Sequence, residues 1–179
     1  MLITFTSGSF PFEYIPTVFE GYSAYLTLNG QSVLISLWDT AGHEEYDKLR
    51  PLSYSNTNVF LCTFSIDNPS SFEHVLTKWS PEISHHCPNT PFLLVGTKRD
   101  LREDSETLRK LEAKQQAPIS WDQGVEMAQK IKAVQYIECS SITLWGVKQL
   151  FEEAAKISLS LTAPKEKENK KDNNNCVIF

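Results

Sequence analysis

The chain has 179 residues, 41% of them hydrophobic, which is enough for one well-buried core and too few to expect two. A formal net charge of −5 and a pI near 5.4 exclude the general basic character that nucleic-acid binding requires. The first residues lack the basic start and apolar length of a signal peptide, and no later apolar run approaches a membrane span. The cysteines are too scattered for a C-x-x-C metal pattern and indicate free thiols in a reducing, intracellular setting: Cys62, Cys87, Cys139 and Cys176.

Five segments of strand character are spaced along the chain: residues 24–28, 33–38, 59–64, 92–95 and 136–139. The first two flank Asn29-Gly30, the dipeptide that best tolerates positive φ at both turn positions, and they predict a β-hairpin. The third and fourth are nearly continuous apolar runs, which are typical of strands covered on both faces. The last is a shorter candidate of the same kind.

Segments of helical period lie between these strands. The clearest has its apolar side chains on one side and a proline that we expect to kink it: Phe72, Val75, Leu76, Trp79 and Ile83, with Pro81. Ser120 and Gln123 predict a capping box at the start of a further helix. A last helix is predicted from about Leu144, with these residues facing inward: Val147, Leu150, Phe151, Ala154 and Leu161. Strands that alternate with helices predict an α/β domain with a mostly parallel sheet.

Two segments depart from this alternation. Residues 102–117 are charged, offer Leu108 and Leu111 as their only large apolar side chains, and predict a helical insert on the surface. From Pro164 onward the composition is Lys, Glu and Asn with no aliphatic residue until Val177, which is typical of a disordered tail. We therefore expect one domain over residues 1–161 and a tail over residues 162–179.

The first of two short polar signatures is Asp39-Thr40-Ala41-Gly42, directly after the strand at 33–38. A carboxylate at the end of a buried strand can hold a magnesium ion, because that hard cation prefers oxygen ligands. Gly42 has no Cβ, so its backbone N–H can approach a terminal phosphate closely. Taken alone, this signature is equally compatible with an ordinary turn.

The second signature is Thr97-Lys98-Arg99-Asp100, after the strand at 92–95. Asp100 can accept hydrogen bonds from the N1–H and exocyclic amine of guanine, while the aliphatic stem of Lys98 can cover the ring. Adenine lacks that pair of donors, so such a site would reject it by roughly 10⁴-fold. A lone T-K-x-D is often a charged turn, but its position about 58 residues after Asp39 favours a guanine-nucleotide site.

With both signatures in place, the chain resembles a Rho/Rac-type small GTPase of the Ras superfamily from about Ile3 to Phe179. Residues 14–19 resemble the first switch of that family, and residues 39–46 resemble the second. Residues 49–54 and the 102–117 insert are similar to features that distinguish the Rho branch. Cys139-Ser140-Ser141 is similar to the third base-recognition turn. The resemblance implies a P-loop NTPase-like small G domain.

The resemblance also implies the roles of individual residues. Thr17 would bind the magnesium through its hydroxyl and the γ-phosphate through its N–H, and Asp39 would be the other metal-binding residue. The GTP or GDP site would comprise Phe10, Thr17, Asp39, Thr40, Ala41, Gly42, His43, Thr97, Lys98, Asp100, Ser140 and Ser141. Phe10 would pack at the edge of the guanine, although a core position is an equal alternative. Effectors would contact Tyr14, Ile15, Pro16, Thr17, Val18, Phe19, Glu20, Gly21 and Tyr22.

The catalytic positions implied by the resemblance are Gly42 and His43. The family has glutamine in place of His43, and its amide orients the attacking water. Imidazole has a different shape and can carry a charge, so we expect slow intrinsic hydrolysis even in an intact site. An exposed loop histidine without consequence is the alternative. Ser141 replaces the family's alanine with little expected effect, because recognition there uses the backbone N–H.

The family's phosphate cradle, G-x-x-x-x-G-K-[ST], is expected upstream of both signatures, but only 38 residues precede Asp39 and none matches it. The family's central first strand is missing with it. Roughly five buried strand side chains at about 1.5–3 kcal/mol each amount to about 7–15 kcal/mol, the whole net stability of a domain. A sheet without this strand should not fold in the same form. Either the complete protein carries the cradle upstream, or a shortened chain binds no nucleotide tightly.

Cys176-Val177-Ile178-Phe179 is a C-a-a-X ending, and phenylalanine in the last place favours geranylgeranyl over farnesyl. Processing would remove the last three residues and leave the lipid on Cys176. One lipid chain anchors reversibly unless a second signal helps. The four lysines of the tail are offset by three acidic residues, so we expect only a weak electrostatic preference for anionic lipid.

Two functional hypotheses follow. In the first, a monomeric, prenylated Rho/Rac-like GTPase cycles between GDP and GTP and controls actin organisation. It would act at the cytoplasmic face of the plasma membrane and in the cytosol, with exchange factors, GTPase-activating proteins, a dissociation inhibitor and effector kinases or scaffolds as partners. In the second, a non-catalytic module offers the same surface and lipid without a nucleotide cycle. His43 and the missing cradle favour the second, whereas Lys98 and Asp100 oppose it.

Overall fold

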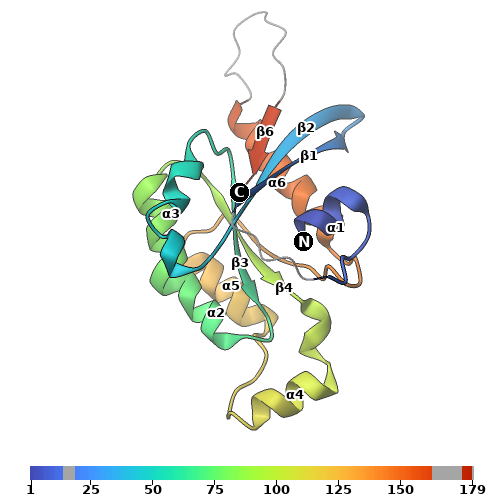
Figure 1. Cartoon of the computed structure of the whole chain (residues 1–179), viewed down its shortest axis with the longest axis vertical. Coiled ribbons are helices and arrows are strands. Elements are labelled where there is room, and N and C mark those ends of the chain that lie inside the picture. The colour runs from blue at the N-terminus through green and yellow to red at the C-terminus, as the bar shows by residue number, and fades with distance from the viewer. Residues whose placement is uncertain (14–18, 163–174, 179) are drawn as a thin grey trace, which may run out of the picture.

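The computed structural model describes residues 1–13, 19–162 and 175–178 (Figure 1). Its first element is helix α1, Leu2–Ser7, which ends at Gly8. Gly8 has a φ of 73°, the left-handed conformation common after a helix, and its N–H donates to the carbonyl of Thr4. The ring of Phe5 stacks on that of Phe151, with 4.0 Å between the ring centroids, so α1 packs against the last long helix of the chain.

The predicted β-hairpin is confirmed. Strands β1, Phe19–Leu28, and β2, Gln31–Thr40, pair antiparallel with Leu28 opposite Gln31. Asn29 and Gly30 have φ values of 50° and 79°, the positive angles that a two-residue turn with the twist of the strands requires. Both strands continue beyond the expected apolar segments, because the backbone pairing runs on to Phe19 opposite Thr40.

The predicted parallel strands are also confirmed. Strands β3, Phe60–Ser65, β4, Phe92–Thr97, and β5, Tyr136–Glu138, form a parallel sheet in the order β3-β4-β5. Successive side chains of β4 enter different cores, since Leu93 and Val95 lie in one and Phe92 and Leu94 in the other. This sheet is therefore buried on both faces, which explains its continuous apolar runs.

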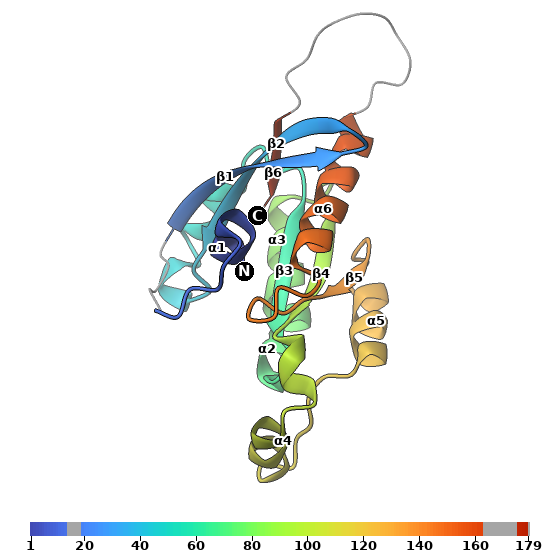
Figure 2. The same ribbon diagram turned by 90° about the vertical axis from the view of Figure 1, so that its right-hand side faces the viewer.

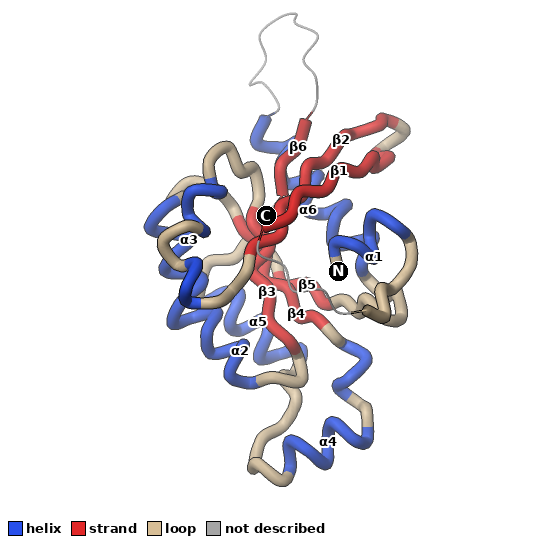
Figure 3. Tube along the Cα trace, viewed as in Figure 1, coloured by secondary structure: helices blue, strands red, loops and turns tan. Residues whose placement is uncertain are grey.

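Helices cover both sides of these strands (Figure 3). On one side, β4 shares a core with the hairpin, α1 and helix α6, Val147–Thr162. On the other, it packs against helices α2, Pro69–His74, α3, Ser80–His86, and α5, Trp121–Lys130. The α/β class expected from the sequence is confirmed.

The end of the tail differs from the expected disorder. Asn175–Ile178 form strand β6, which pairs parallel with β2 in the register Leu34 to Asn175 and Leu37 to Ile178. A further parallel bridge joins Ile178 to Val59, just before β3. The strand β6 thus lies between β2 and β3, near the centre of Figure 1. The sequence predicts that the central strand of the family's sheet is missing. The composition of the tail gave no sign of β6, because its pairing partners lie more than a hundred residues earlier.

The kink expected at Pro81 stays a prediction, but the helix contains a π-helical turn directly ahead of it. The segment η3, Val75–Trp79, connects α2 to α3 without a break in the chain's helical path. Pro81 has no N–H to donate and its ring crowds the preceding turn, so the helix widens ahead of it. Val75, the first residue of this turn, and Ile83 in α3 are buried as predicted.

The predicted capping box is confirmed at the start of α5. The hydroxyl of Ser120 accepts from the N–H of Gln123 at 3.2 Å, and the side chain of Gln123 accepts from the N–H of Ser120 at 2.9 Å. The charged insert contains helix α4, Ser105–Glu112, capped by the carboxylate of Asp104. Helix α4 extends away from the strands at one end of the molecule (Figures 1 and 2).

The last helix differs from its prediction at both ends. It begins at Val147 instead of near Leu144, because Leu144 and Gly146 have positive φ values of 65° and 71° that an α-helix does not admit. Four predicted inward residues are buried: Val147, Leu150, Phe151 and Ala154. Leu161, expected to face inward, is 59% exposed. Of the helices described here, none is long and apolar enough to cross a membrane.

Candidate functional site

The first signature lies at the carboxyl end of β2, beside the carboxyl end of β4. Asp39 and Thr40 end β2, Thr97 ends β4, and these residues line one cavity of about 250 Å³ together with Thr63. The remaining described lining residues are apolar: Met1, Leu2, Trp38, Leu61 and Ile178. Ligands of open α/β sheets bind outside the carboxyl ends of the strands, which is where this cavity lies.

The second signature and the turn at 139–141 are held together by the backbone. Gly96 of β4 accepts from the N–H of Cys139 at 2.9 Å, and Cys139 accepts in turn from the N–H of Arg99 at 3.1 Å. Lys98 has a φ of 58°, and this left-handed residue turns the chain from β4 into the short helix η4, Arg99–Arg102. Sequence reasoning assigned both segments to one base site, and the structure brings them side by side.

Asp100 presents an unusual carboxylate within this turn. Its Oδ1 atom is buried and has no hydrogen-bond partner among the residues that the structure describes. A buried acceptor without a partner costs about 1–3 kcal/mol, more when it is charged. The side chain is thus poised to accept hydrogen bonds from a donor that enters the site.

Two contacts of the second signature involve residues that sequence reasoning missed. The Nζ of Lys98 lies 3.5 Å from Oδ1 of Asp67, which follows β3. The guanidinium of Arg99 lies over the ring of Trp145 at 4.5 Å from its centroid. No local signal in the sequence marks Asp67 or Trp145, because each meets the signature from a separate loop.

Ser140 and Ser141 differ in their surroundings. Ser140 is buried, its N–H donates to the carbonyl of Trp145 at 2.9 Å, and its hydroxyl accepts from the N–H of Thr143 at 3.2 Å. It therefore shapes the turn through its own hydrogen bonds. Ser141 is half-buried, so its backbone is the better placed of the two to reach a ligand.

A buried ion pair between Arg102 and Glu138 lies next to the turn at 139–141. Glu138 is 3% exposed, and its carboxylate accepts from Arg102 at 2.8 Å and from the hydroxyl of Tyr136 at 2.7 Å. Arg102 also donates to the carbonyl of Ile119 at 2.9 Å. Burial, with the hydrogen bond to Glu138, raises the pKa of Tyr136, and burial raises the pKa of Cys139 to about 11. Arg102 thus anchors the insert, so the first residue of that predicted surface segment has a structural role.

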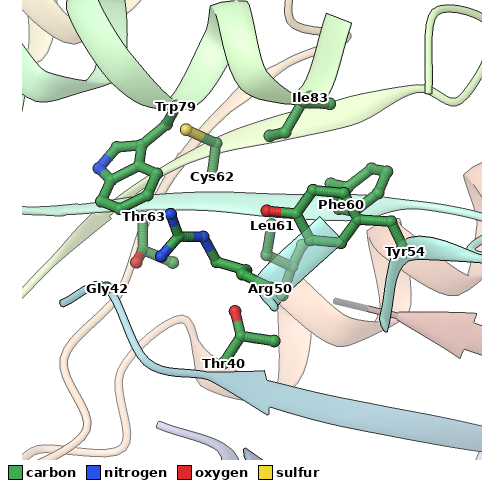
Figure 4. Close-up of a pocket in the computed structure, with 10 residues that line it drawn as sticks. All are labelled: Thr40, Gly42, Arg50, Tyr54, Phe60, Leu61, Cys62, Thr63, Trp79 and Ile83. Atoms are coloured by element: carbon green, nitrogen blue, oxygen red, sulfur yellow. The ribbon is translucent and has the colours of Figure 1, made fainter. Parts of the chain in front are cut away.

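Next to the first signature lies a cluster around Arg50 that the sequence did not predict (Figure 4). Arg50 belongs to the short helix η2, Arg50–Tyr54, and is only 2% exposed. Its guanidinium donates to the carbonyl of Ala41 at 3.0 Å and lies 4.8 Å from the ring centroid of Trp79. These groups border a cavity of about 200 Å³ that Gly42 and Thr40 also line. Arg50 therefore fixes the turn of the first signature.

Carboxylates from two elements hold Arg50 in place. Glu82 of α3 accepts two hydrogen bonds from the guanidinium, each of 2.9 Å, and also accepts from the hydroxyl of Tyr54. Asp47 pairs with Arg50 and with Lys78, the latter at 3.0 Å. Burial works to raise the pKa of Glu82, but the hydrogen bonds from Arg50 and Tyr54 outweigh it and leave that pKa lowered. The cluster therefore ties the segment after Gly42 to α3.

The expected catalytic residues lie on the surface. Gly42 and His43 are exposed, and His43 precedes the short helix η1, Glu44–Tyr46, whose last N–H donates to the carbonyl of His43 at 3.0 Å. Ala41 is buried and Thr40 is half-buried. The loop therefore places the His43 side chain toward solvent, next to a turn that Arg50 holds.

Of the expected effector residues, the structure describes only the last four. Phe19, Glu20, Gly21 and Tyr22 lie in β1, where the hydroxyl of Tyr22 donates to Glu20 and that contact raises the pKa of Tyr22 to about 12. Tyr14, Ile15, Pro16, Thr17 and Val18 lie outside the described residues, as does the expected metal contact of Thr17. Phe10 is half-buried and meets Phe12 edge-on at 5.7 Å, so it is not a core residue here.

The donor set fits a guanine nucleotide better at the base than at the phosphates. The buried Oδ1 of Asp100 has no partner among the described residues and can accept a hydrogen bond, and guanine offers two N–H donors, at N1 and at its amino group. At the other end, Asp39 is an oxygen ligand suited to magnesium. The described residues that line the cavity at Asp39 include no lysine, arginine or histidine, and the described chain holds no group of three metal-binding His, Cys, Asp or Glu residues.

Parallel strands flanked by helices, with polar loops at their carboxyl ends, define an α/β domain of the nucleotide-binding kind. A model of the Ras family matches residues 1–160. The chain therefore belongs to the Ras family of small GTPases, whose members bind GTP or GDP with Mg²⁺, act as signalling switches, and work with exchange factors, GTPase-activating proteins and effectors.

Proposed function

We propose that this chain is a guanine-nucleotide-dependent signalling switch of the Rho/Rac type. The observation that carries the proposal is Asp100, whose buried Oδ1 has no hydrogen-bond partner among the described residues. The N1–H and amino group of guanine would satisfy this carboxylate, whereas adenine would leave it unpaired. Selection of the base thus comes from the cost of a desolvated acceptor.

Each residue of the base side has a distinct task in this proposal. Asp100 accepts from the base, the stem of Lys98 covers the ring, and the N–H of Ser141 faces the base carbonyl. Asp67 holds the Lys98 ammonium at 3.5 Å, which directs the stem. Ser140 positions the turn through its bond to Trp145.

On the phosphate side, Asp39 and Thr17 are the proposed magnesium ligands. A bound GTP supplies the γ-phosphate whose transfer to water is the family's reaction. The N–H groups of Thr17 and Gly42 would contact that phosphate only in the triphosphate state, which orders the loops around them. The Arg50 guanidinium already holds the carbonyl of Ala41, so the turn is preorganised for the contact.

Two features support the Rho/Rac branch within the family. The charged insert forms a separate helix, α4, and residues 49–54 present exposed apolar side chains next to the first signature. Leu49 is 51% exposed and Leu52 is 75% exposed, so both side chains are accessible to a protein partner. Exchange factors, GTPase-activating proteins, a dissociation inhibitor and effector kinases or scaffolds are the proposed partners, with actin organisation as the output.

Membrane attachment through a geranylgeranyl group on Cys176 is a further part of the proposal. Its support is the C-a-a-X pattern of residues 176–179. The proposed location is the cytoplasmic face of the plasma membrane, in exchange with the cytosol. A single prenyl chain with little basic excess gives reversible attachment.

A second candidate is a non-catalytic interaction module, and one observation favours it. The described lining of the cavity at Asp39 carries no basic side chain that could neutralise phosphate oxygens. His43, in place of a water-orienting glutamine, points the same way. Such a module would keep the partner surface at residues 49–54 without a nucleotide cycle.

Isothermal titration of the purified chain with GDP and Mg²⁺ tests the two candidates. The switch requires submicromolar binding of GDP and roughly 10⁴-fold weaker binding of ADP. Asp100→Ala should weaken GDP by at least about 100-fold, because the base then loses two hydrogen bonds to a charged acceptor. Asp122→Ala, an exposed carboxylate at the start of α5, is the matched control. An unaltered chain with no affinity for GDP would leave the interaction module as the function.

A further inference from the structure

We propose that the gap between β2 and β3 is a strand-accepting site, and that its occupant is the chain's own segment Asn175–Ile178. The segment lies parallel to β2 over four consecutive residue pairs, from Leu34 and Asn175 to Leu37 and Ile178. It also bridges to Val59 in parallel orientation. The ligand class that this gap recognises is therefore an extended peptide strand with an aliphatic residue near its end.

Hydrogen bonds are the first reason that the gap needs an occupant. The described strands fall into two three-stranded groups, β1-β2-β6 and β3-β4-β5. Among the described strands, only β6 lies at the boundary between the two groups, so its removal would leave the edge of β2 that faces β3 with unpaired N–H and C=O groups. Such an edge inside a domain is costly, because buried backbone groups require partners.

Apolar burial is the second reason. Ile178 is 1% exposed and belongs to one core with Ile35, Leu37 and Val59, each of which is fully buried. The side chain thus closes the core from between the two strands that flank it. A polar or charged residue at this position would face these aliphatic groups without a partner.

Asn58 clamps the segment on its β3 side. The side chain of Asn58 accepts from the N–H of Val177 at 2.8 Å, and the N–H of Asn58 donates to the carbonyl of Val177 at 3.1 Å. The backbone N–H and C=O of Val177 are therefore both hydrogen-bonded to Asn58. This two-point contact sets the register in which Ile178 reaches the core.

The chain's own tail is the occupant for a reason of geometry. Residues 163–174 connect α6 to β6, and twelve residues reach up to about 40 Å when extended. A tether of this length gives an effective concentration in the millimolar range, which exceeds the concentration of a competing copy in dilute solution. The same segment from a second copy would require a dimer.

Occupation of the gap excludes lipid modification, a consequence that rests on the lipidation proposed above. In prenyl transfer the Cys176 sulfur forms a thioether with the first carbon of geranylgeranyl diphosphate, inorganic diphosphate leaves, and the thiol proton passes to solvent. The transferase must bind residues 176–179. In β6, however, Ile178 is buried and Cys176 is paired with Ile35 of β2. The tail can therefore serve as β6 or as a lipid acceptor, and not as both at once.

Hydrogen exchange and thermal unfolding test the strand site. Val177→Pro removes the N–H that Asn58 accepts and should make the β2 amides of residues 34–37 exchange at least about 100-fold faster. Ile178→Ala, which keeps the backbone intact, should lower the Tm by about 5–15 °C. Asn89→Ala, at an exposed loop position, is the control and should change neither measurement. Unchanged exchange and Tm in both tail variants would overturn the proposal.

The identity of the occupant is tested with a peptide and by mass. A peptide of residues 172–179 at millimolar concentration should restore slow exchange at β2 in the Val177→Pro chain, and the same peptide with proline in place of Val177 should not. The unaltered chain should be a monomer by light scattering at micromolar concentration. Protection that appears only in a dimer, or a peptide without effect, would contradict a site filled from within the chain.

Modification in vitro tests the exclusion with a variant that leaves residues 176–179 unchanged. Asn58→Ala releases the clamp and should raise the initial rate of geranylgeranyl transfer at least about tenfold over the unaltered chain. Equal rates would contradict the exclusion. If neither chain is modified, the lipidation proposal fails, while the exchange data still decide the strand site.

Discussion

Arg50 brings a positive charge into the core, and the groups around it show what that charge does. The guanidinium is 2% exposed and meets Glu82, Asp47, the carbonyl of Ala41 and the ring of Trp79. Removal of one partner from such a cluster is more costly than its formation is favourable, because the remaining charge stays buried. Arg50 is therefore best understood as the residue that positions the turn at Gly42.

The free energy of unfolding should depend on pH through the ionisation of Glu82. Its pKa is lowered from 4.5 in the folded chain, so its contribution is fully present above about pH 4.5 and is lost as the pH falls through the lowered value. Glu82→Gln should cost about 3 kcal/mol at pH 7, the lower end of the range for a broken buried pair, because Asp47 still faces Arg50.

Urea denaturation at pH 7 and pH 3 measures this effect. The difference between the unaltered chain and Glu82→Gln should be smaller at pH 3 than at pH 7, whereas Glu126→Gln, at an exposed position of α5, should match the unaltered chain at both. A difference that is independent of pH would show that the charge of Glu82 has no part in it.

His43 makes a separate prediction about catalysis. Its exposed side chain lies beside Gly42, where a glutamine amide would orient the attacking water. In a single-turnover assay on chain loaded with GTP and Mg²⁺, His43→Gln should hydrolyse about 10–100-fold faster, the range associated with better positioning of a reactant. Equal hydrolysis rates for the two chains would contradict the prediction that His43 slows hydrolysis.

At the scale of elements, local chemistry predicted most of the regular structure. The Asn29-Gly30 turn and the Ser120 capping box each depend on groups within a few residues, and both are present. The proximity of the second signature to the turn at 139–141 was predictable in the same way, because each segment follows an apolar strand of one parallel sheet, whereas their binding of a base stays a prediction. The Arg50 cluster was not, since a single arginine in a polar segment has no period that reveals its burial.

Strand β6 escaped prediction for a different reason. Val177 and Ile178 favour strands, but four residues after a polar segment are too few to show an alternating pattern, and the segment matched a lipidation motif instead. Only the open gap between β2 and β3, which is formed by residues 34–37 and 58–60, makes an extended conformation favourable for them. Tertiary context decided the outcome here.

The contact between α5 and β5 yields a prediction at this scale. An added Cβ at Gly124 would lie 2.2 Å from two ring carbons of Tyr136, a buried side chain whose hydroxyl is fixed by Glu138. Gly124→Ala should therefore destabilise the fold by about 1–3 kcal/mol despite the higher helix propensity of alanine.

Urea denaturation of single and double variants checks this clash. Because Tyr136→Leu removes the ring, the double variant with Gly124→Ala should lose less than the sum of the two single losses. Additive losses, or a Gly124→Ala chain as stable as the original, would show that α5 can shift away from the ring without cost.

At the scale of the whole molecule, the two halves of the described sheet depend on a segment that is distant in sequence. Asn58 and Val177 are separated by 119 positions, yet they share the contact that places β6 beside β3. The hairpin, α1 and β6 belong to the same core as one face of β4. Removal of the β6 pairing should thus destabilise both the hairpin and the parallel strands.

The position of β6 in the chain also bears on how the protein is made. Strand β2 leaves the ribosome before residues 175–178 are made, so the edge that β6 occupies lacks this partner during synthesis, and unpaired edges favour association between nascent chains. Contacts of this sequence separation form slowly, because a long loop must close before they are gained. We therefore expect the chain to be most prone to aggregation in the interval before β6 pairs with β2.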